Sequence, residues 1–457
     1  MRRRRGSDNM NWKRMKRAWM LCACAMFLGL SMGTYKVQAK GVDDYGALKV
    51  SGTHLVSRRT NENVVLRGVS THGINWDVGY PYISKKAFQT LRDDYSVNAV
   101  RLAMYTTEYY GYCDKGSASE SQSQVQKTLQ ARIDTGVKAA TDLGMYVIID
   151  WHILNDQNPN KYKKQAKAFF KAMSEKYAQQ DNVLYEICNE PNGGTSWSDI
   201  TKYAKEIIPV IRKNDPDAII IVGTPTWSQD VDVAAEKPLD YDNVLYTLHF
   251  YSATHKDSYR AKLKKALDKG LPVIVSEFGV SPASGDGTID TKEAKKWLDY
   301  LDENEISYFA WSLSNKAESA SLLKSSTKKT SGWSKSDLSP AGKWIFSQYA
   351  LRSGNVKPSN SKPAKVKSVK LTRGSKKIKV RFSKVSNATG YQVVYSTSKK
   401  YSKAKKKLIY KNTTTLKGLK KGKTYYVKVR AFYKKSGTKV YGSYLSLIHI
   451  SEPTRPY

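Results

Sequence analysis

Val183-Leu-Tyr-Glu-Ile-Cys-Asn189 is a short, mostly apolar stretch without strict alternation, and Glu190 follows it directly. Apolar runs of this length and character are typical of parallel strands that are covered on both faces. The segments that share this character on either side of it are Val64–Ser70, Asn98–Met104, Tyr146–Trp151, Ala218–Gly223, Val244–Tyr251, Pro272–Phe278 and Tyr308–Ser312. The sequence therefore predicts eight strands of one parallel sheet.

Stretches with helical periodicity fill the gaps between these strands, and the last stretch follows the eighth strand. They are Lys85–Tyr95, Val125–Leu143, Lys161–Tyr177, Trp197–Lys213, His255–Lys269, Thr291–Glu303 and Pro340–Leu351. Strands and helices that alternate in this way predict an α/β protein with a closed (β/α)₈ TIM barrel, which we place at residues 40–352. The alternative, a doubly wound open sheet, usually carries a GxGxxG loop after its first strand, and Arg67–Gly73 lacks that spacing.

The N-terminal residues 1–39 have the pattern of a secretory signal peptide. Basic residues at Arg2–Arg5 and Lys13–Arg17 precede the apolar run Ala18–Met32, and Val37-Gln-Ala39 offers a small-residue cleavage site. The apolar run is short for a membrane span. We therefore expect a secreted, extracellular protein, with association at the cell surface left open.

A change of composition marks a second domain. Residues 353–363 are rich in Ser, Pro and Gly and predict a linker. Residues 364–444, called the basic module below, carry short alternating strands such as Lys377–Phe382 and Gly390–Ser396, which predict an all-β antiparallel sandwich. The last residues, 445–457, lack the Lys and Tyr bias of this module, so we interpret them as a sequencing-adapter artefact and expect the module to be truncated.

The positive charge of the chain is uneven. The formal net charge is +37, and no Asp or Glu occurs between Leu338 and Ser451. Such a surface either keeps a secreted module soluble or attracts a polyanion of the cell envelope. We expect no nucleic-acid partner and a monomeric protein.

Polar and aromatic side chains stand at or just after the ends of the predicted strands. In a β/α barrel these ends form one rim, which carries the active site. One such residue is usually structural, but a polar residue after nearly every strand favours a site. The set consists of His72, Arg101, Tyr105, Asp150, His152, Asn189, Glu190, Trp227, Gln229, His249, Tyr251, Glu277, Trp311, Lys316 and Glu318.

Two glutamates in this set indicate the chemistry. Glu190 and Glu277 follow the fourth and seventh strands, which face each other across a barrel. Glycosidic hydrolysis needs one carboxylic acid to protonate the leaving oxygen and one carboxylate to attack or to activate water. Arg101 and Tyr251 are placed to keep one of the two carboxylates ionised.

The motifs around these glutamates resemble those of glycoside hydrolase family five. They are Asn98-Ala-Val-Arg101, Asp150-Trp-His152, Val183–Pro191, Leu248-His-Phe-Tyr251, Ile274–Gly279 and Ala310–Ser314. The resemblance implies a retaining double displacement with Glu277 as nucleophile and Glu190 as acid/base. It also implies that Asn189 bonds the sugar 2-hydroxyl and that Trp311 forms the floor of the cleavage subsite, with Arg101, His152, His249 and Tyr251 in support.

Further motifs are similar to the bacterial endoglucanase branch of that family: Thr71–Trp76, Thr224–Gln229 and Lys316-Ala-Glu318. They imply a secreted endo-β-1,4-glucanase acting on cellulose and related β-glucans. The substrate-binding residues then implied are His72, Trp76, Tyr105, Trp227, Gln229, Lys316 and Glu318. Another β-glycan, such as mannan, xylan or mixed-linkage glucan, and a non-catalytic glycan binder remain as alternatives.

No cofactor and no metal is expected, because His152 and His249 come from separate strands and no metal-binding motif is present. In the basic module, Ala388–Ser396 and Leu416–Ala431 resemble a fibronectin type III domain. The two cysteines beyond the leader, Cys113 and Cys188, give no disulfide framework.

Overall fold

The computed structural model describes residues 39–114, 120–353, 363, 365–385, 388, 390–435, 438–445 and 448–450. The chain divides into two compact units, Met1–Asn355 and Val356–Tyr457. The predicted signal peptide, most of the predicted linker and most of the 445–457 tail lie outside the described residues. None of the described helices has the length and apolar character needed to cross a membrane.

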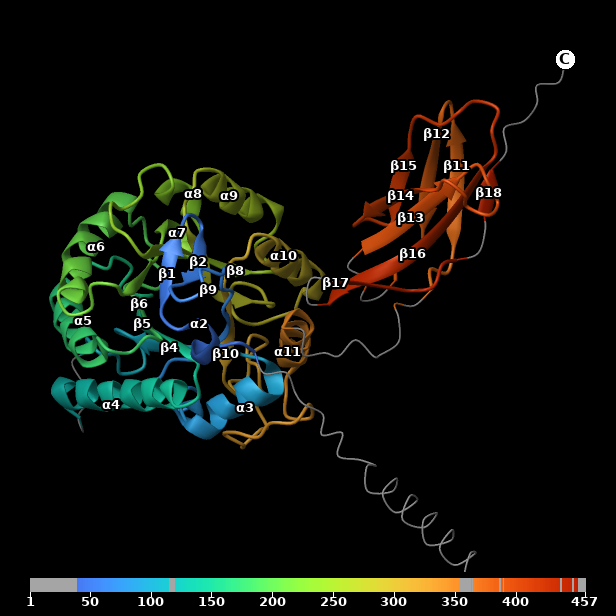
Figure 1. The fold of residues 1–457 in the computed structure, drawn as a ribbon. Coiled ribbons are helices and arrows are strands. Elements are labelled where there is room, and N and C mark those ends of the chain that lie inside the picture. The colour runs from blue at the N-terminus through green and yellow to red at the C-terminus, as the bar shows by residue number, and fades with distance from the viewer. Residues whose placement is uncertain are drawn as a thin grey trace, which may run out of the picture. The chain divides into compact units, whose positions relative to one another are not determined.

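The first unit is a closed barrel of eight parallel strands, which confirms the predicted fold (Figure 1). The last strand pairs with the first and closes the barrel. In chain order the strands are β3 (Arg67–Thr71), β4 (Ala99–Tyr105), β5 (Tyr146–His152), β6 (Val183–Glu186), β7 (Ile219–Val222), β8 (Val244–Tyr251), β9 (Val273–Gly279) and β10 (Tyr308–Leu313).

The predicted helices surround this barrel (Figure 1). They are α3 (Lys85–Tyr95), α4 (Gln122–Thr141), α5 (Lys163–Tyr177), α6 (Trp197–Arg212), α9 (Asp257–Asp268), α10 (Thr291–Glu303) and α11 (Pro340–Arg352). The structure adds short helices that were not predicted: α2 (Val42–Tyr45), η1 (Tyr80–Tyr82), α7 (Pro225–Ser228) and α8 (Val231–Ala234). Local chemistry explains several of the starts. The side chains of Ser84, Ser121, Ser196 and Ser339 each accept a hydrogen bond from a backbone N–H of the first turn of α3, α4, α6 and α11.

A hairpin that the sequence analysis did not predict covers one end of the barrel (Figure 1). Its strands are β1 (Leu48–Ser51) and β2 (His54–Ser57). Leu48 and Leu55 are buried in one apolar cluster with barrel-interior residues such as Ile148. The hairpin therefore closes the end opposite the carboxyl ends of the strands and leaves that other rim for the polar residues.

The second unit is all-β and antiparallel, as predicted. One sheet has the order β11-β12-β15, and the other has β14-β13-β16-β17 with β18 on β16. A buried cluster that includes Val380, Val393 and Val429 joins residues of both sheets. The resemblance to fibronectin type III remains a prediction. The bounds are β11 (Val369–Gly374), β12 (Lys377–Phe382), β13 (Gly390–Ser396), β14 (Lys405–Ile409), β15 (Thr413–Leu416), β16 (Tyr425–Lys435), β17 (Thr438–Tyr441) and β18 (Ile448–Ile450).

Three residues of the predicted artefact tail take part in this unit. Ile448–Ile450 pairs with Tyr425–Val427 as β18. The pairing does not test the origin of the tail, so the interpretation as adapter sequence stays a prediction.

The hairpin offers a test of the barrel core. Leu55 is 4 % exposed, and we expect Leu55→Ala to lower the free energy of unfolding of the barrel by about 2–4 kcal/mol, because the lost side chain leaves a cavity. The exposed Ser51 on the same hairpin provides the control, and Ser51→Ala should change stability by less than about 0.5 kcal/mol. Urea unfolding followed by tryptophan fluorescence measures both. Equal stabilities of the two variants would show that the hairpin is not part of the core.

Candidate active site

The carboxyl ends of the barrel strands bring most of the predicted site residues together. Successive inward-facing positions of a barrel strand form layers, and the layer nearest this rim is polar. Tyr105 ends β4, His152 ends β5 and Tyr251 ends β8. Glu277 lies near the end of β9, and Glu190 follows β6. Residues as far apart in the sequence as Tyr105 and Glu277 thus share one rim.

The two glutamates face each other at short range. An oxygen of Glu190, an oxygen of Glu277 and a ring nitrogen of His249 all lie within 4.8 Å of one another. The register between β8 and β9 shifts between the pairs Thr247–Ile274 and His249–Glu277. Such a bulge re-aims the side chains that follow it, so it helps to turn Glu277 toward Glu190.

A buried arginine connects the polar layer. Arg101 is fully buried, and its Nε donates to Glu186 Oε2 at 2.7 Å. One terminal nitrogen donates to Glu277 Oε2 at 3.1 Å, and the other donates to Asn189 Oδ1 at 2.7 Å and lies 3.0 Å from Asp150. A guanidinium has five N–H donors in a fixed plane, so Arg101 sets the positions of all four partners at once.

Glu277 receives a second hydrogen bond, from the hydroxyl of Tyr251 to Oε1 at 2.7 Å. Gly279 makes room for this tyrosine, because a Cβ there would lie 2.4 Å from the Tyr251 ring. Burial raises the pKa of Glu277, and the charge of Glu190 adds to the rise, while His249 and Arg101 oppose it. Glu277 is therefore a carboxylate with both oxygens engaged and with a raised pKa.

A chain of hydrogen bonds supports Glu190 from behind. His249 Nδ1 lies 2.9 Å from Glu190 Oε1, and His249 Nε2 lies 2.9 Å from Ser276 Oγ. The Ser276 hydroxyl donates to Glu186 Oε1 at 2.6 Å. Burial alone would lower the pKa of His249, but the carboxyl group of Glu186, 3.8 Å from Nε2, and the hydrogen bond to Glu190 raise it to about 9. The imidazole is therefore protonated at neutral pH and donates from both nitrogens.

Two carboxyl groups beside Arg101, those of Glu186 and Asp150, differ in their charge. Burial would raise the pKa of Glu186, but Arg101 and His249 lower it to about 2, so Glu186 is ionised. Asp150 has its pKa raised well above the usual range by burial, against the attraction of Arg101. The single arginine is thus balanced mainly by Glu186 and Glu277.

His152 has the opposite protonation state to His249. Burial and the neighbouring Arg101 lower the pKa of His152 to about 4, so the ring is neutral at neutral pH. Its Nδ1 lies 2.6 Å from Asp150 Oδ2 and its Nε2 lies 3.2 Å from Asn189 Nδ2. Asn189 Nδ2 also donates to the Ile153 carbonyl at 3.1 Å, which orients the amide.

Aromatic rings line the rim beside the glutamates. Trp311 is 6 % exposed and stacks on His152, with ring centroids 5.4 Å apart. The ring of Tyr105 lies 4.1 Å from the same histidine, and both Tyr105 and Tyr251 share a small buried cluster with Trp311. These flat faces are suited to the C–H faces of a sugar ring.

A second aromatic group lies around His72. Its ring is 5.2 Å from Trp311 and 5.3 Å from Trp76. Lys316 Nζ lies 2.6 Å from Glu318 Oε2 and 5.5 Å from the Trp76 ring. His72 Nε2 lies 4.0 Å from Glu318. The predicted residues His72, Trp76, Lys316 and Glu318 therefore form one contiguous group.

Trp227 lies in α7, and Gln229 directly follows this helix. Trp227 is 45 % exposed, and its backbone is left-handed, with φ of 56°. Its N–H donates to the carbonyl of Pro191, which directly follows Glu190. Gln229 is half-buried, and its side chain makes no hydrogen bond to the other predicted residues in the described part of the chain.

The sequence analysis missed three residues of this site. Glu186 and Ser276 were assigned only to strands, although a glutamate inside an apolar strand was a signal that a buried partner exists. Tyr109 stacks on Trp76 with centroids 4.3 Å apart, and it is 42 % exposed. The Tyr109-Tyr110 pair shortly after β4 could have indicated an aromatic rim.

Glu190, His249 and Glu277 are also the kind of cluster that can hold a metal ion. Their atoms already have protein partners, since Glu277 bonds Arg101 and Tyr251 while His249 bonds Glu190 and Ser276. The geometry thus serves acid–base chemistry without an ion, and the absence of a metal requirement stays a prediction.

The hydrogen-bond chain can be tested through the titration of His249. We expect Glu186→Gln to lower the pKa of His249 from about 9 toward its ordinary value, because the buried negative charge is lost. Ser276→Ala should act in the same direction while leaving Arg101 paired with Glu186. The measurement is the histidine Cε1 NMR shift against pH, assigned with His249→Asn.

The matched control is Glu175→Gln, which removes an exposed carboxylate on α5. It should leave the pKa of His249 unchanged. If the pKa of His249 were unchanged in both Glu186→Gln and Ser276→Ala, the proposed hydrogen-bond chain would be contradicted.

The comparisons with known proteins agree with this geometry. The family model described as Cellulase (glycosyl hydrolase family 5) matches residues 57–317. "Endoglucanase A" of Butyrivibrio fibrisolvens is 49 % identical over 306 residues, which cover 66 % of this chain and 68 % of the relative. "Endoglucanase" of Clostridium saccharobutylicum is 45 % identical over 339 residues, or 74 % and 72 % of the two chains.

Solved structures show the same relationship. "Cellulase Cel5C_n" superimposes with a TM-score of 0.61 at 44 % identity and covers 67 % of this chain and 92 % of its own. The catalytic domain of Thermobifida fusca endoglucanase Cel5A with cellotetraose has a TM-score of 0.62 at 35 % identity, with 67 % and 98 % coverage. With the family model spanning the barrel and relatives this similar over most of their length, the chain belongs to glycosyl hydrolase family 5, the cellulase family.

Proposed function

We propose that this chain is an endo-β-1,4-glucanase that retains the anomeric configuration through a covalent glycosyl-enzyme intermediate. The single observation that carries the mechanism is the approach of the Glu190 and Glu277 oxygens to within 4.8 Å. Retaining glycosidases place their two carboxyl groups about 5–5.5 Å apart, whereas inverting enzymes need about 6.5–9.5 Å to admit a water molecule.

In the first step Glu277 attacks the anomeric carbon and forms an ester bond to it, while the bond from that carbon to the glycosidic oxygen breaks. Glu190 donates the proton that the leaving oxygen takes up. Glu277 suits the attacking role because Arg101 and Tyr251 hold its oxygens in place by hydrogen bonds. The protonated His249 beside Glu190 Oε1 stabilises the carboxylate that Glu190 becomes when it gives its proton away.

In the second step Glu190 takes a proton from water, and the resulting hydroxide attacks the anomeric carbon. The ester bond to Glu277 breaks, and Glu277 returns to the carboxylate held by Arg101. The Glu190–His249 pair therefore loses one proton in the first step and regains one in the second. Two inversions leave the anomeric configuration unchanged.

The substrate assignment is supported by the names of the relatives, which are endoglucanases and cellulases. The aromatic faces of Trp311, Trp76 and Tyr109 are suited to sugar rings next to the cleavage point. We infer from the leader pattern at residues 1–39 that the enzyme acts outside the cell. Digestion of a panel of β-glucan, mannan and xylan, scored by reducing ends and product length, tests both substrate and endo action.

Substitution of the two glutamates tests their separate roles. We expect Glu277→Gln to lower kcat on soluble β-1,4-glucan by roughly 10⁴-fold or more, since no nucleophile remains. Glu190→Ala should lower it by about 10²–10⁴-fold on the glucan. In Glu190→Ala, formation of the glycosyl-enzyme intermediate from a dinitrophenyl cellobioside should be much less affected. The dinitrophenolate leaving group needs no proton.

The surface variant Glu206→Gln on α6 is the control and should keep full activity. Proton NMR of the first product identifies its anomer. An initial α-anomer, or glucan hydrolysis that survives in Glu277→Gln, would refute the retaining mechanism with this nucleophile.

The raised pKa of Glu277 predicts the acid side of the activity profile. Glu277 must be ionised to attack, so kcat/KM falls as pH drops through its pKa, and this fall should begin above the ordinary range near 4.3. Tyr251→Phe removes a donor to the ionised form, so the pKa should rise further and the acid limb should move to higher pH.

Tyr203→Phe is the matched control, because that buried hydroxyl donates to the Ile187 carbonyl instead of a carboxylate. It should leave the acid limb in place. An acid limb that is the same in wild type and Tyr251→Phe would argue against Glu277 as the group that sets it.

A further inference from the structure

One sheet of the basic module presents a regular row of cations to solvent. Along β12, Lys377, Lys379 and Arg381 are exposed, while the residues between them are buried. The antiparallel register places Lys370 of β11 opposite Arg381 on the same face. Successive same-face residues of a strand lie about 7 Å apart, so β12 carries three positive charges along about 14 Å.

Within the described residues of this face, no acidic side chain neutralises the row. No Asp or Glu occurs from position 338 to 451. Within the described part of the module, no hydrogen bond or ion pair engages the side chains of Lys377, Lys379 and Arg381. The other outward positions of this sheet are small or polar: Thr372, Gly374, Thr413 and Thr415.

The opposite sheet uses its cations differently. Lys428 Nζ lies 4.1 Å from the Tyr401 ring and 4.4 Å from the Tyr444 ring. The Arg430 guanidinium lies 3.9 Å from Tyr441 and donates from Nε to Gln392. These cations are held against aromatic rings, so they stabilise the module itself and are less available to a partner.

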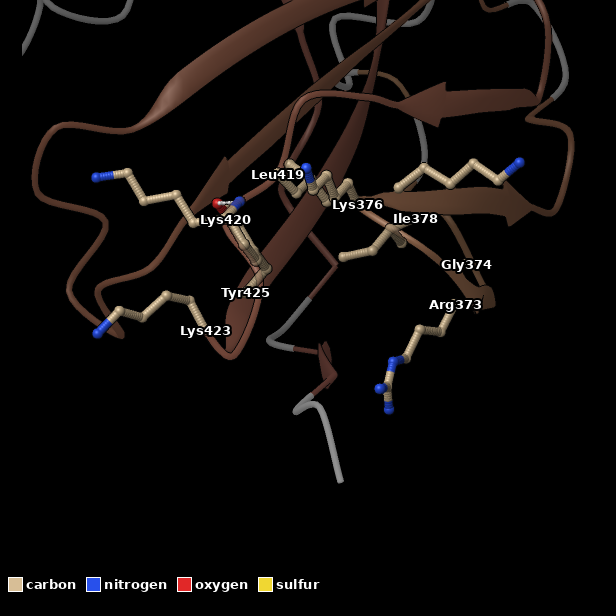
Figure 2. A pocket seen from close by; sticks show the side chains of 9 residues that line it. Arg373, Gly374, Lys376, Ile378, Leu419, Lys420, Lys423 and Tyr425 are labelled. Carbon is tan, nitrogen blue, oxygen red and sulfur yellow. Dashed lines mark hydrogen bonds between the residues drawn. The ribbon is translucent and has the colours of Figure 1, made fainter. Parts of the chain in front are cut away.

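The cationic row continues past the end of β12. The residues that line a shallow hollow there include the cations Arg373, Lys376, Lys377, Lys420 and Lys423. Figure 2 shows that Lys420 and Lys423 extend to one side while Arg373 extends in another direction, so their charged groups diverge. Divergent charges do not enclose one small anion, but they extend the field over which a long polyanion is attracted.

We propose that the outer face of the β11-β12-β15 sheet, called the β12 face, binds a flexible linear polyanion of the phosphodiester class that carries no bases. The spacing of the row fits a polymer with one negative charge per short repeat, and the absence of carboxylates lets every cation contribute. This inference concerns the second unit alone and does not depend on the proposed glucanase activity.

The composition of the face selects among polyanions. Proteins that bind single-stranded nucleic acid stack the bases on aromatic side chains, and none of the outward residues of the β12 face is aromatic. Surface insertion into a membrane needs exposed apolar side chains, which these positions also lack. A base-free phosphodiester needs only cations and hydroxyl donors, and the face supplies both.

The test compares two variants of the full chain with equal loss of charge. The first is Lys377→Gln/Lys379→Gln/Arg381→Gln on β12. The control, called the β14 variant, is Lys403→Gln/Lys405→Gln/Lys406→Gln, which changes three exposed lysines in and just before β14. The probe is fluorescent polyglycerol phosphate, titrated at low salt and at about 0.5 M NaCl. A dT oligomer with the same number of charges and neutral dextran are the competitors.

We expect wild type to bind the probe, with affinity that falls steeply with salt. The β12 variant should lose about tenfold in affinity and the β14 variant less than about threefold. The charge-keeping variant Lys377→Arg/Lys379→Arg should bind like wild type, and thermal unfolding with β-glucan activity checks that each variant is folded.

Three results would overturn the proposal. If wild type did not bind polyglycerol phosphate, the proposed binding site would be refuted. Equal losses of affinity in the β12 and β14 variants would show that the net charge of the module attracts the probe and that the β12 face has no special role. Tighter binding of the dT oligomer than of polyglycerol phosphate would assign the face to nucleic acid instead.

Discussion

A single guanidinium holds the polar layer of this barrel together. Arg101 is completely buried, and it reaches carboxyl groups on β5, β6 and β9 and the amide that follows β6. A buried charge is tolerated only when partners satisfy it, and removing one partner of such a network costs about 3–5 kcal/mol. The four strands must therefore meet in one register for the charge to be buried at all. The fold and the site depend on the same contacts.

This network also makes the two glutamates unequal. Glu277 lies inside it, with Arg101 and Tyr251 on its two oxygens, so it is held as an oriented carboxylate. Glu190 lies outside it and contacts the network only through His249, Ser276 and Glu186. One residue is thus fixed for attack, and the other is linked to a group that can carry a proton. The difference arises from where each strand ends, since both side chains are the same.

The two units of the chain use charge in opposite ways. The barrel compensates its internal cation with carboxylates, and the module carries cations in a stretch without any carboxylate. On one sheet of the module, tyrosines hold Lys428 and Arg430, and on the other Lys377, Lys379 and Arg381 face water. The barrel is organised around a small reacting centre, while the module offers an extended surface.

The sequence by itself determined the barrel, its helices and the rim residues, because these follow from local patterns: apolar runs for the strands, helical periodicity between them, and polar residues placed after nearly every strand. Only the tertiary structure decided which of those residues meet. Glu186 and Ser276 are 90 positions apart, and Tyr109 contacts Trp76 from a loop. No sequence periodicity predicts either contact. The hairpin Leu48–Ser57 escaped prediction for the same reason, since its burial depends on the inward faces of strands far along the chain. Contacts of this kind are set by strand register and packing, which local sequence patterns do not encode.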